Sequence, residues 1–107
     1  MKEIKAIIRD YMVDHVIDAL EQLREPPGIT VTPVRGVGHT VRPESPDRLI
    51  AGAKLEMVVP DDRVEEIVGI VASKSHTGRS GDGIVFVLDV ERAVRVRTGK
   101  EDDDAVR

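Results

Sequence analysis

Residues 54–88 read KLEMVVPDDRVEEIVGIVASKSHTGRSGDGIVFVL and carry the clearest secondary-structure pattern of the chain. The first six residues predict a strand that ends at Pro60. The next apolar side chains recur at the spacing of one helix face, at Val64, Ile67, Val68 and Val71. The run Ile84–Leu88 is apolar throughout, as in a buried strand. This stretch therefore predicts a strand, a helix and a second strand, with a glycine-containing loop over residues 73–83.

The first part of the chain shows the same order of elements without repeating the sequence. Residues 2–9 alternate and then become apolar, which indicates a strand. The following apolar residues have helical spacing, at Val13, Val16, Ile17, Leu20 and Leu23. Pro26-Pro27-Gly28 should stop this helix, and residues 29–34 are rich in β-branched side chains. Pro33 restricts that last strand to a sheet edge or a bulge.

Two strand–helix–strand units in 107 residues favour one α+β domain, residues 1–107. The expected architecture is a ferredoxin-like split βαβ sandwich, an antiparallel sheet with two helices on one face. Outside these units, residues 39–53 contain two prolines and two arginines without a clear period, which predicts an exposed loop. Residues 94–97 alternate and predict a short fifth strand. The tail, residues 98–107, is acidic, and we expect it to be mobile.

The composition excludes several classes of protein. The chain has no cysteine, so disulfides and thiolate chemistry are ruled out. A net charge of −4 with only 2% aromatic residues argues against nucleic acid as a partner. No run approaches the roughly 18 apolar residues that span a bilayer, and the first residues do not resemble a secretion signal. We therefore expect a cytoplasmic protein that does not insert into a membrane.

The hydrophobic core must be aliphatic, because the only aromatic residues besides histidine are Tyr11 and Phe86. A core of this kind in so small a chain is thin, since small domains bury a smaller part of their surface. Sharing the core between subunits is a common remedy. The composition therefore points to an oligomer.

The loop Thr77-Gly78-Arg79-Ser80-Gly81-Asp82-Gly83 is the first candidate site. Closely spaced glycines let backbone N–H groups converge on phosphate oxygens. The same residues are also ordinary turn formers, and no Lys-Ser/Thr pair follows as in a Walker A loop. The loop by itself favours a simple turn.

Arg95 and Arg97 strengthen the phosphate interpretation. Two positions apart on a strand, they would point to the same face, and guanidinium groups match phosphate geometry. The alternative is a solvated edge strand. The three histidines are too dispersed to predict a metal site.

The chain resembles the PII signal-transduction family, which consists of trimeric nucleotide-binding regulators. The resemblance covers nearly the whole chain outside residues 39–53. It rests on residues 2–9, 28–38, 54–62, 77–87 and 94–99, above all TGRSGDGIVFV and VRVRTG. It implies a homotrimer with nucleotide-binding clefts between subunits and a single PII-like domain. Residues 74–83 would be the family's B-loop, and residues 39–53 its T-loop.

The resemblance also implies the site residues. Gly81, Asp82 and Gly83 would wrap the phosphates, with Arg95 and Arg97 contributed by the neighbouring subunit. Thr30, Glu56 and Val58 would lie near the adenine or the ribose, and Gly36 and Gly38 at the base of the T-loop. The further nucleotide-binding candidates are Ile7, Val37, His39, Thr77, Gly78 and Arg79. Arg42, Ser45 and Arg48 would contact a protein partner.

Departures from the family pattern suggest a divergent member. His39 and Thr40 stand where nitrogen regulators have Arg-Gln, which puts 2-oxoglutarate sensing in doubt. Ile84 replaces a lysine that binds phosphate, so ADP or AMP should bind at least as well as ATP. The T-loop is several residues short and has no tyrosine to accept uridylylation.

From the sequence we expect a regulator that binds ADP, AMP or ATP and needs no cofactor, with the role of magnesium left open. Its T-loop would control a partner such as a bicarbonate transporter or another membrane transporter. The alternatives are a nitrogen-regulatory PII protein that senses ATP and 2-oxoglutarate, a slow ATPase, and a structural or metal-binding trimer. No catalytic residue is expected.

Overall fold

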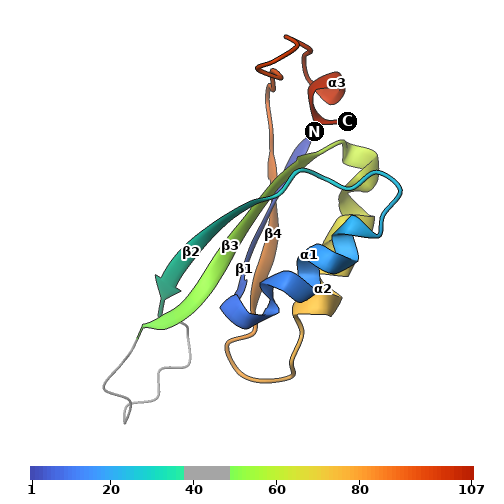
Figure 1. The fold of residues 1–107 in the computed structure, drawn as a ribbon. Coiled ribbons are helices and arrows are strands. Elements are labelled where there is room, and N and C mark those ends of the chain that lie inside the picture. The colour runs from blue at the N-terminus through green and yellow to red at the C-terminus, as the bar shows by residue number, and fades with distance from the viewer. Residues whose placement is uncertain (38–48) are drawn as a thin grey trace.

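The computed structural model describes residues 1–37 and 49–107. Along the chain, the elements run from β1 near the N-terminus to a short helix near the C-terminus (Figure 1). In order they are β1 (Lys2–Arg9), η1 (Asp10–Met12), α1 (Val13–Glu21), β2 (Thr30–Gly36), β3 (Ile50–Val59), η2 (Asp61–Arg63), α2 (Val64–Ser75), β4 (Gly83–Asp89) and α3 (Asp103–Val106).

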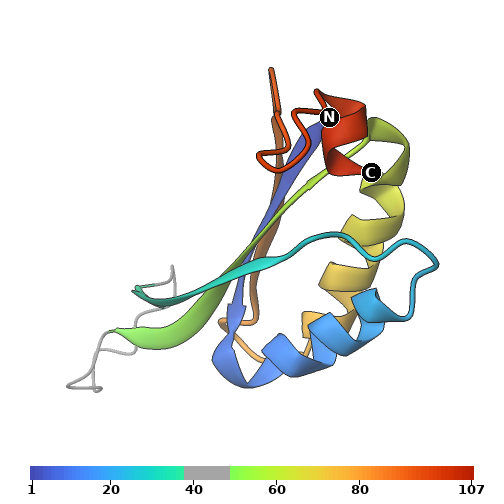
Figure 2. The same ribbon diagram turned by 45° about the horizontal axis from the view of Figure 1, so that its top comes forward.

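The strands of the described residues form one four-stranded sheet in the order β2-β3-β1-β4. Every neighbouring pair is antiparallel. Helices α1 and α2 pack side by side on one face of this sheet (Figure 2). The predicted ferredoxin-like α+β architecture is confirmed. Pro33 lies on the edge strand β2, opposite Ala53, where its missing N–H is tolerated.

The core lies between the sheet and the two helices. Alternate residues of β1 and β3 face it, because successive strand side chains point to opposite faces. Apart from one methionine, the buried cluster is aliphatic, as the composition predicts. It consists of Ile4, Ala6, Ile8, Val16, Leu20, Ala53, Leu55, Met57, Val59, Ile67 and Val71.

The opposite face of the sheet is not covered by α1 or α2. The intervening residues of β1 and β3 lie on it, among them Glu3, Ile7, Glu56 and Val58. They are half-buried or exposed. Several predicted nucleotide-binding residues therefore share this open face.

The predicted loop 39–53 is wrong at its C-terminal end. Residues 50–53 belong to β3 and pair with residues 33–36 of β2. Alanine and glycine are weak strand formers, so the pattern around Gly52 hides the strand. The ladder with β2 and β1 overrides this local preference. Leu49 is exposed and precedes the strand, and the remaining residues of the predicted T-loop, 39–48, lie outside the described residues.

The predicted fifth strand and mobile tail are also wrong. Val94 forms an isolated bridge with Glu101, and residues 96–98 form a turn. The Arg95 N–H donates to Lys100 O at 2.8 Å, so this segment pairs with itself instead of extending the sheet. Within the acidic tail, α3 buries Ala105, which is 8% exposed. Burial of this one apolar side chain helps to hold the tail on the domain.

Candidate functional site

A pocket of about 440 Å³ lies at the end of the sheet where β1 begins and β3 ends. Its lining includes four of the predicted nucleotide-binding residues, Thr30, Glu56, Val58 and Arg95. The strand register brings the first three together, because Thr30 lies opposite Glu56 on the neighbouring strand. Sequence reasoning missed the other lining residues, which are Glu3, Gly28, Ala105 and Val106.

Strand pairing accounts for the missed acidic residue. Glu3 lies opposite Val58 on the open face, a pairing that no local pattern reveals. Each pocket carboxylate has a lysine beside it, with Glu56 3.4 Å from Lys54 and Glu3 3.2 Å from Lys5. The pocket thus offers carboxylate oxygens for N–H or O–H donors, an apolar contact and the cation Arg95. This set suits a base and a sugar.

Helix α3 forms one wall of the pocket and holds Arg95. The Arg95 Nε–H donates to Ala105 O at 3.1 Å. Ala105 and Val106 are an apolar pair behind a run of acidic residues, and this contrast was the available sequence signal. The Arg95 guanidinium is thereby fixed at the pocket, although the sequence predicted a mobile tail.

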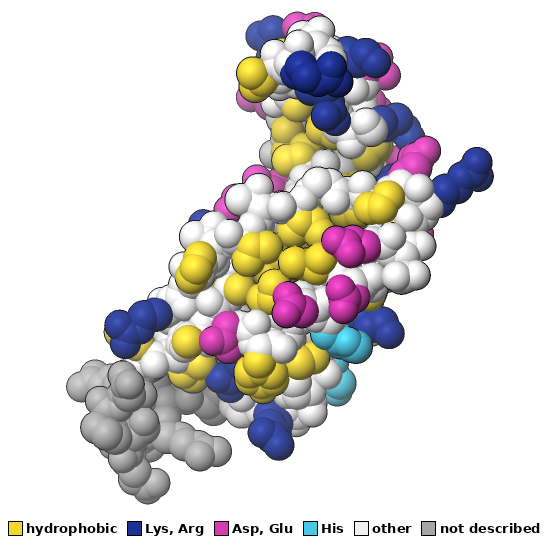
Figure 3. All heavy atoms as spheres, viewed as in Figure 1, with side chains coloured by type: hydrophobic (Ala, Val, Ile, Leu, Met, Phe, Trp, Pro, Cys, Tyr) yellow, Lys and Arg dark blue, Asp and Glu magenta, His cyan; other side chains and the backbone are white. Residues whose placement is uncertain are grey.

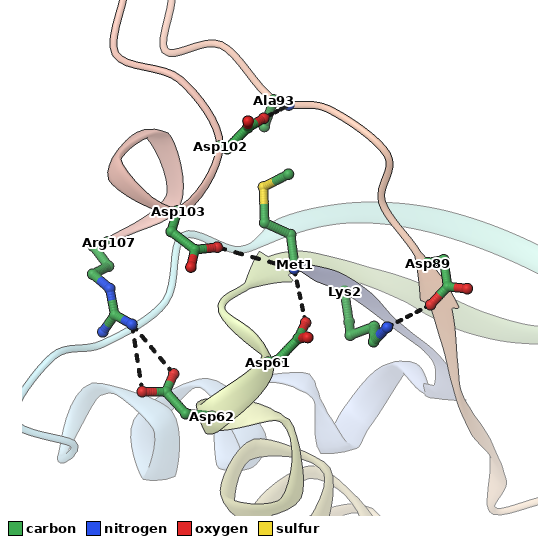
Figure 4. Close-up of polar contacts among 9 residues, drawn as sticks. All are labelled: Met1, Lys2, Asp61, Asp62, Asp89, Ala93, Asp102, Asp103 and Arg107. Atoms are coloured by element: carbon green, nitrogen blue, oxygen red, sulfur yellow. Dashed lines mark hydrogen bonds and ion pairs between the residues drawn. The ribbon is translucent and has the colours of Figure 1, made fainter.

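Ion pairs fasten this C-terminal segment to the domain (Figure 4). Arg107 lies 3.4 Å from Asp62, and Asp103 lies 4.0 Å from the α-ammonium of Met1, which itself pairs with Asp61 at 2.7 Å. The hydrogen bond from that ammonium lowers the pKa of Asp61. Lys2 pairs with Asp89 at 2.5 Å, and this hydrogen bond raises the pKa of Lys2.

Asp102 closes the hairpin that carries Arg95. Its Oδ1 accepts the Ala93 N–H at 3.2 Å, and its own N–H donates to Ala93 O at 2.8 Å. The residue has φ of 53°, an uncommon conformation for a side chain other than glycine. These two bonds tie the ends of residues 93–102 together.

The predicted pairing of Arg95 with Arg97 on one strand face has no strand to support it within one chain. Residues 96–98 form a turn, and the strand alternation on which the prediction rested is absent there. Arg97 is exposed, as are Arg92 and Lys100 on the same segment. Figure 3 shows Lys and Arg side chains gathered around this end of the molecule. The segment is a basic protrusion on a chain with a net charge of −4.

The loop between α2 and β4 is folded around the carboxylate of Asp82. Its Oδ2 accepts the N–H groups of Thr77 at 2.7 Å and Gly78 at 2.9 Å, and its Oδ1 accepts the Thr77 hydroxyl. The Arg79 N–H in turn donates to Thr77 Oγ1 at 3.2 Å. The hydrogen bonds from Thr77 hold the pKa of Asp82 below its usual value. Asp82 therefore shapes the loop.

The glycine loop and the pocket lie at opposite ends of the sheet. Gly83 pairs with Ile8, whereas Leu88 pairs with Glu3 beside the pocket. The five residue steps from Gly83 to Leu88 correspond to about 17 Å at ~3.3 Å per residue. In Figure 1 the loop lies at the bottom of the view and α3 at the top. One chain therefore does not bring the predicted phosphate loop to the predicted adenine residues.

Apart from Arg97 on the basic segment, the described candidates fall into two groups. The group at the loop end comprises Ile7, Gly36, Val37, Thr77, Gly78, Arg79, Gly81, Asp82 and Gly83, and the group at the pocket end comprises Thr30, Glu56, Val58 and Arg95. Gly38, His39, Arg42, Ser45 and Arg48 lie outside the described residues.

Two kinds of feature are absent from the described ranges, 1–37 and 49–107. None of the helices there is long and apolar enough to cross a membrane. No group of three or more His, Cys, Asp or Glu side chains in these ranges is placed to hold a metal ion.

Comparison with known proteins identifies a full-length match. The family model described as "Nitrogen regulatory protein P-II" matches residues 1–100. The chain is 41% identical to "Nitrogen regulatory protein P-II 1" of Escherichia coli (strain K12), over 116 residues that cover 99% of this chain and 100% of the relative. It is 39% identical, with the same coverage, to "Nitrogen regulatory protein P-II" of Haemophilus influenzae and of Pasteurella multocida.

These alignments are longer than the chain itself. Each spans 116 residues, whereas the chain has 107, so this chain lacks residues that its relatives have. The shortened T-loop expected from the sequence is one place for such a deletion.

Proposed function

Because the chain belongs to the nitrogen regulatory protein P-II family, we propose that it is a homotrimeric nitrogen regulator that binds adenine nucleotides between neighbouring chains. The family consists of regulatory proteins, so the chain is a regulator and not an enzyme. A slow ATPase would need a general base at the phosphates. Asp82 is a poor candidate, because both of its carboxylate oxygens accept hydrogen bonds from the loop.

One observation carries the proposal, namely the division of the candidate residues between the two ends of the sheet. The pocket has acceptors for a base and a sugar and one arginine, whereas the loop has backbone N–H groups suited to phosphate. A head-to-tail ring of chains would set the loop of one chain beside the pocket of the next. Each cleft would then hold a complete nucleotide site.

Within such a cleft, each chain would supply different chemistry. The pocket side would hold the adenine and ribose against Thr30, Glu56 and Val58. Arg95 would reach the phosphates, and the basic segment that carries Arg97 would attract them over a longer range. The glycine loop of the neighbouring chain would donate backbone N–H groups.

The names of the relatives favour nitrogen regulation over control of a bicarbonate transporter. The protein partner would be contacted through residues 39–48, in the cytoplasm. His39 and Thr40 make 2-oxoglutarate sensing the first property to test. Because Ile84 contributes no charge at the loop, we propose that ATP, ADP and AMP bind with affinities within about tenfold of one another.

Calorimetric titration tests this function. Wild-type protein is titrated with ATP, ADP, AMP and cyclic AMP, each with and without magnesium, 2-oxoglutarate and bicarbonate. Arg95→Gln should weaken nucleotide binding by about tenfold or more, because it removes the cation at the pocket. Arg92→Gln is the matched control, since Arg92 lies on the same segment but pairs with Glu101 at 3.2 Å and does not line the pocket. No binding by wild-type protein at millimolar nucleotide would refute the proposal.

Mixing two defective chains tests the cleft itself. Chains with Arg95→Gln and chains with Asp82→Ala are unfolded together and refolded. In each mixed trimer, one of the three clefts, or about a quarter of all clefts after random assembly, would combine an intact loop with an intact Arg95, so binding should return. Failure to recover binding in verified mixed trimers would show that the loop and the pocket do not act in one cleft.

A further inference from the structure

The glycine loop rests on a cation that the site predictions did not include. Arg9 is the last residue of β1, and its Nη2 donates to Ser80 O at 2.8 Å. A Cβ atom added to Gly81 would overlap Nη2 and lie 3.1 Å from Cζ of the same guanidinium. The backbone at Ser80 and Gly81 therefore packs directly on the Arg9 side chain.

This contact ties the loop to the centre of the sheet. β1 pairs with β3 on one side and with β4 on the other, and Arg9 itself pairs with Gly52 of β3, so the guanidinium is attached to a central strand of the sheet. Asp82 holds the first half of the loop from within, at Thr77 and Gly78. Arg9 holds the second half from outside. The two contacts together set the loop conformation.

Stability alone does not account for an arginine at this position. Its Nε is buried and has no hydrogen-bond partner among the residues that the structure describes. A buried donor without a partner costs free energy, whereas an apolar side chain of similar length would avoid that cost. The guanidinium therefore calls for a role other than packing.

The positive charge of Arg9 gives it an electrostatic role in the loop. Asp82 places a negative charge inside a loop that is to receive an anion, because its carboxylate accepts hydrogen bonds from within the loop. The Arg9 guanidinium, which contacts the same loop, offsets the repulsion between the Asp82 carboxylate and a bound anion. We propose that Arg9 is the positioning residue of the phosphate loop, which fixes its conformation and makes its local potential suitable for phosphate. The phosphate part of this inference rests on the proposed nucleotide function.

The test uses Arg9→Met, which keeps much of the stem and removes the charge and the hydrogen bond. Arg9→Lys keeps the charge without the planar fork, and it should retain part of the function. Arg24→Met is the matched control, because it removes the same charge at an exposed position after α1. Thermal unfolding of all variants comes first, so that a general loss of stability is recognised.

The first readout needs no nucleotide. In Arg9→Met, hydrogen exchange at the amides of Thr77 and Gly78 should be faster by about tenfold or more, while the β1–β3 ladder keeps its protection. Unchanged exchange at these amides would overturn the inference, whether or not nucleotides bind. A loss of protection spread over β1 and β3 would also overturn it, because it would indicate a purely structural role.

The second readout is affinity for ATP, ADP, AMP and adenosine. Arg9→Met should weaken ATP binding by about tenfold to a hundredfold, with a smaller loss for AMP and none for adenosine. An equal loss for all four ligands would overturn the phosphate role of Arg9. If wild-type protein binds none of them, the proposed function fails, and the exchange measurement alone decides whether Arg9 positions the loop.

Discussion

Gly83→Ala should destabilise the protein severely for a reason unrelated to phosphate. Gly83 is the first residue of β4 and pairs with Ile8, at a φ of 121°. An added Cβ would overlap the carbonyl oxygen of Ile7 and lie 3.0 Å from its carbonyl carbon. That atom belongs to the backbone of β1, which cannot move aside as a flexible side chain would.

The cost has two parts. The unfavourable φ for alanine costs on the order of 1–3 kcal/mol. Separation of β4 from β1 at this position also weakens ladder hydrogen bonds worth about 0.5–1.5 kcal/mol each. We therefore expect a loss of about 2–4 kcal/mol, which lowers the Tm of a chain of this size by roughly 10–30 °C.

Thermal and urea unfolding followed by circular dichroism, at one fixed protein concentration, would measure this loss. Gly69→Ala is the matched control, because Gly69 lies in α2 and an added Cβ meets nothing within 4 Å. That change should stabilise the protein by about 0.5–1 kcal/mol, since alanine favours the helix. A Gly83→Ala variant whose Tm stays within two or three degrees of wild type, by the scaling above, would show that β4 does not approach β1 in this way.

Three further outcomes follow from the described contacts. The pKa of Asp82 should lie below the ordinary carboxyl value of about 3.9, because Thr77 stabilises the charged form. The hydrogen bonds from the loop to Asp82 should therefore be fully formed above pH ~3.9, and they should be lost as the pH falls through the lowered pKa. Carboxyl NMR shifts would measure this, and titration at the ordinary value would contradict it. Leu55→Ala should cost about 2–5 kcal/mol in urea unfolding, because Leu55 is fully buried, and a loss under about 1 kcal/mol would mean that the core repacks. Ala105→Arg should lift α3 from the domain and weaken nucleotide binding with little change in Tm; unchanged affinity would mean that α3 is not part of the working pocket.

The strand–helix–strand order could be read from the sequence because its periods are local. The helical stripe of α2 and the apolar run of β4 each depend on residues a few positions apart, and both elements form where the pattern predicts them. Their ends differ, because α2 continues to Ser75 and β4 begins at Gly83, so the loop is shorter than the predicted 73–83. The strand predicted as buried is half-buried or exposed, since it lies at the edge of the sheet. Pro33 also identified an edge strand correctly, because its missing N–H restricts where it can lie in any sheet.

The same reasoning gave wrong predictions for the C-terminal region. Residues 94–97 alternate like a strand, but the Arg95 N–H donates to Lys100 O and the segment folds back on itself. The acidic tail looks unstructured, yet Ala105 is buried and Arg107 pairs with Asp62, which lies far away in the sequence. A local pattern contains no information about such distant contacts.

The candidate site divides in the same way. Composition, periodicity and motif resemblance by themselves determined the fold class, the family and most of the residues worth testing. The tertiary structure alone decided their arrangement, because strand register is set by pairing across the sheet and not by neighbours in the chain. That register places Glu3 and Val58 at one end and the loop beside Gly83 at the other, with Arg9 beneath the loop. The separation of these two groups, which no linear pattern contains, is the physical reason for proposing a cleft built from two chains.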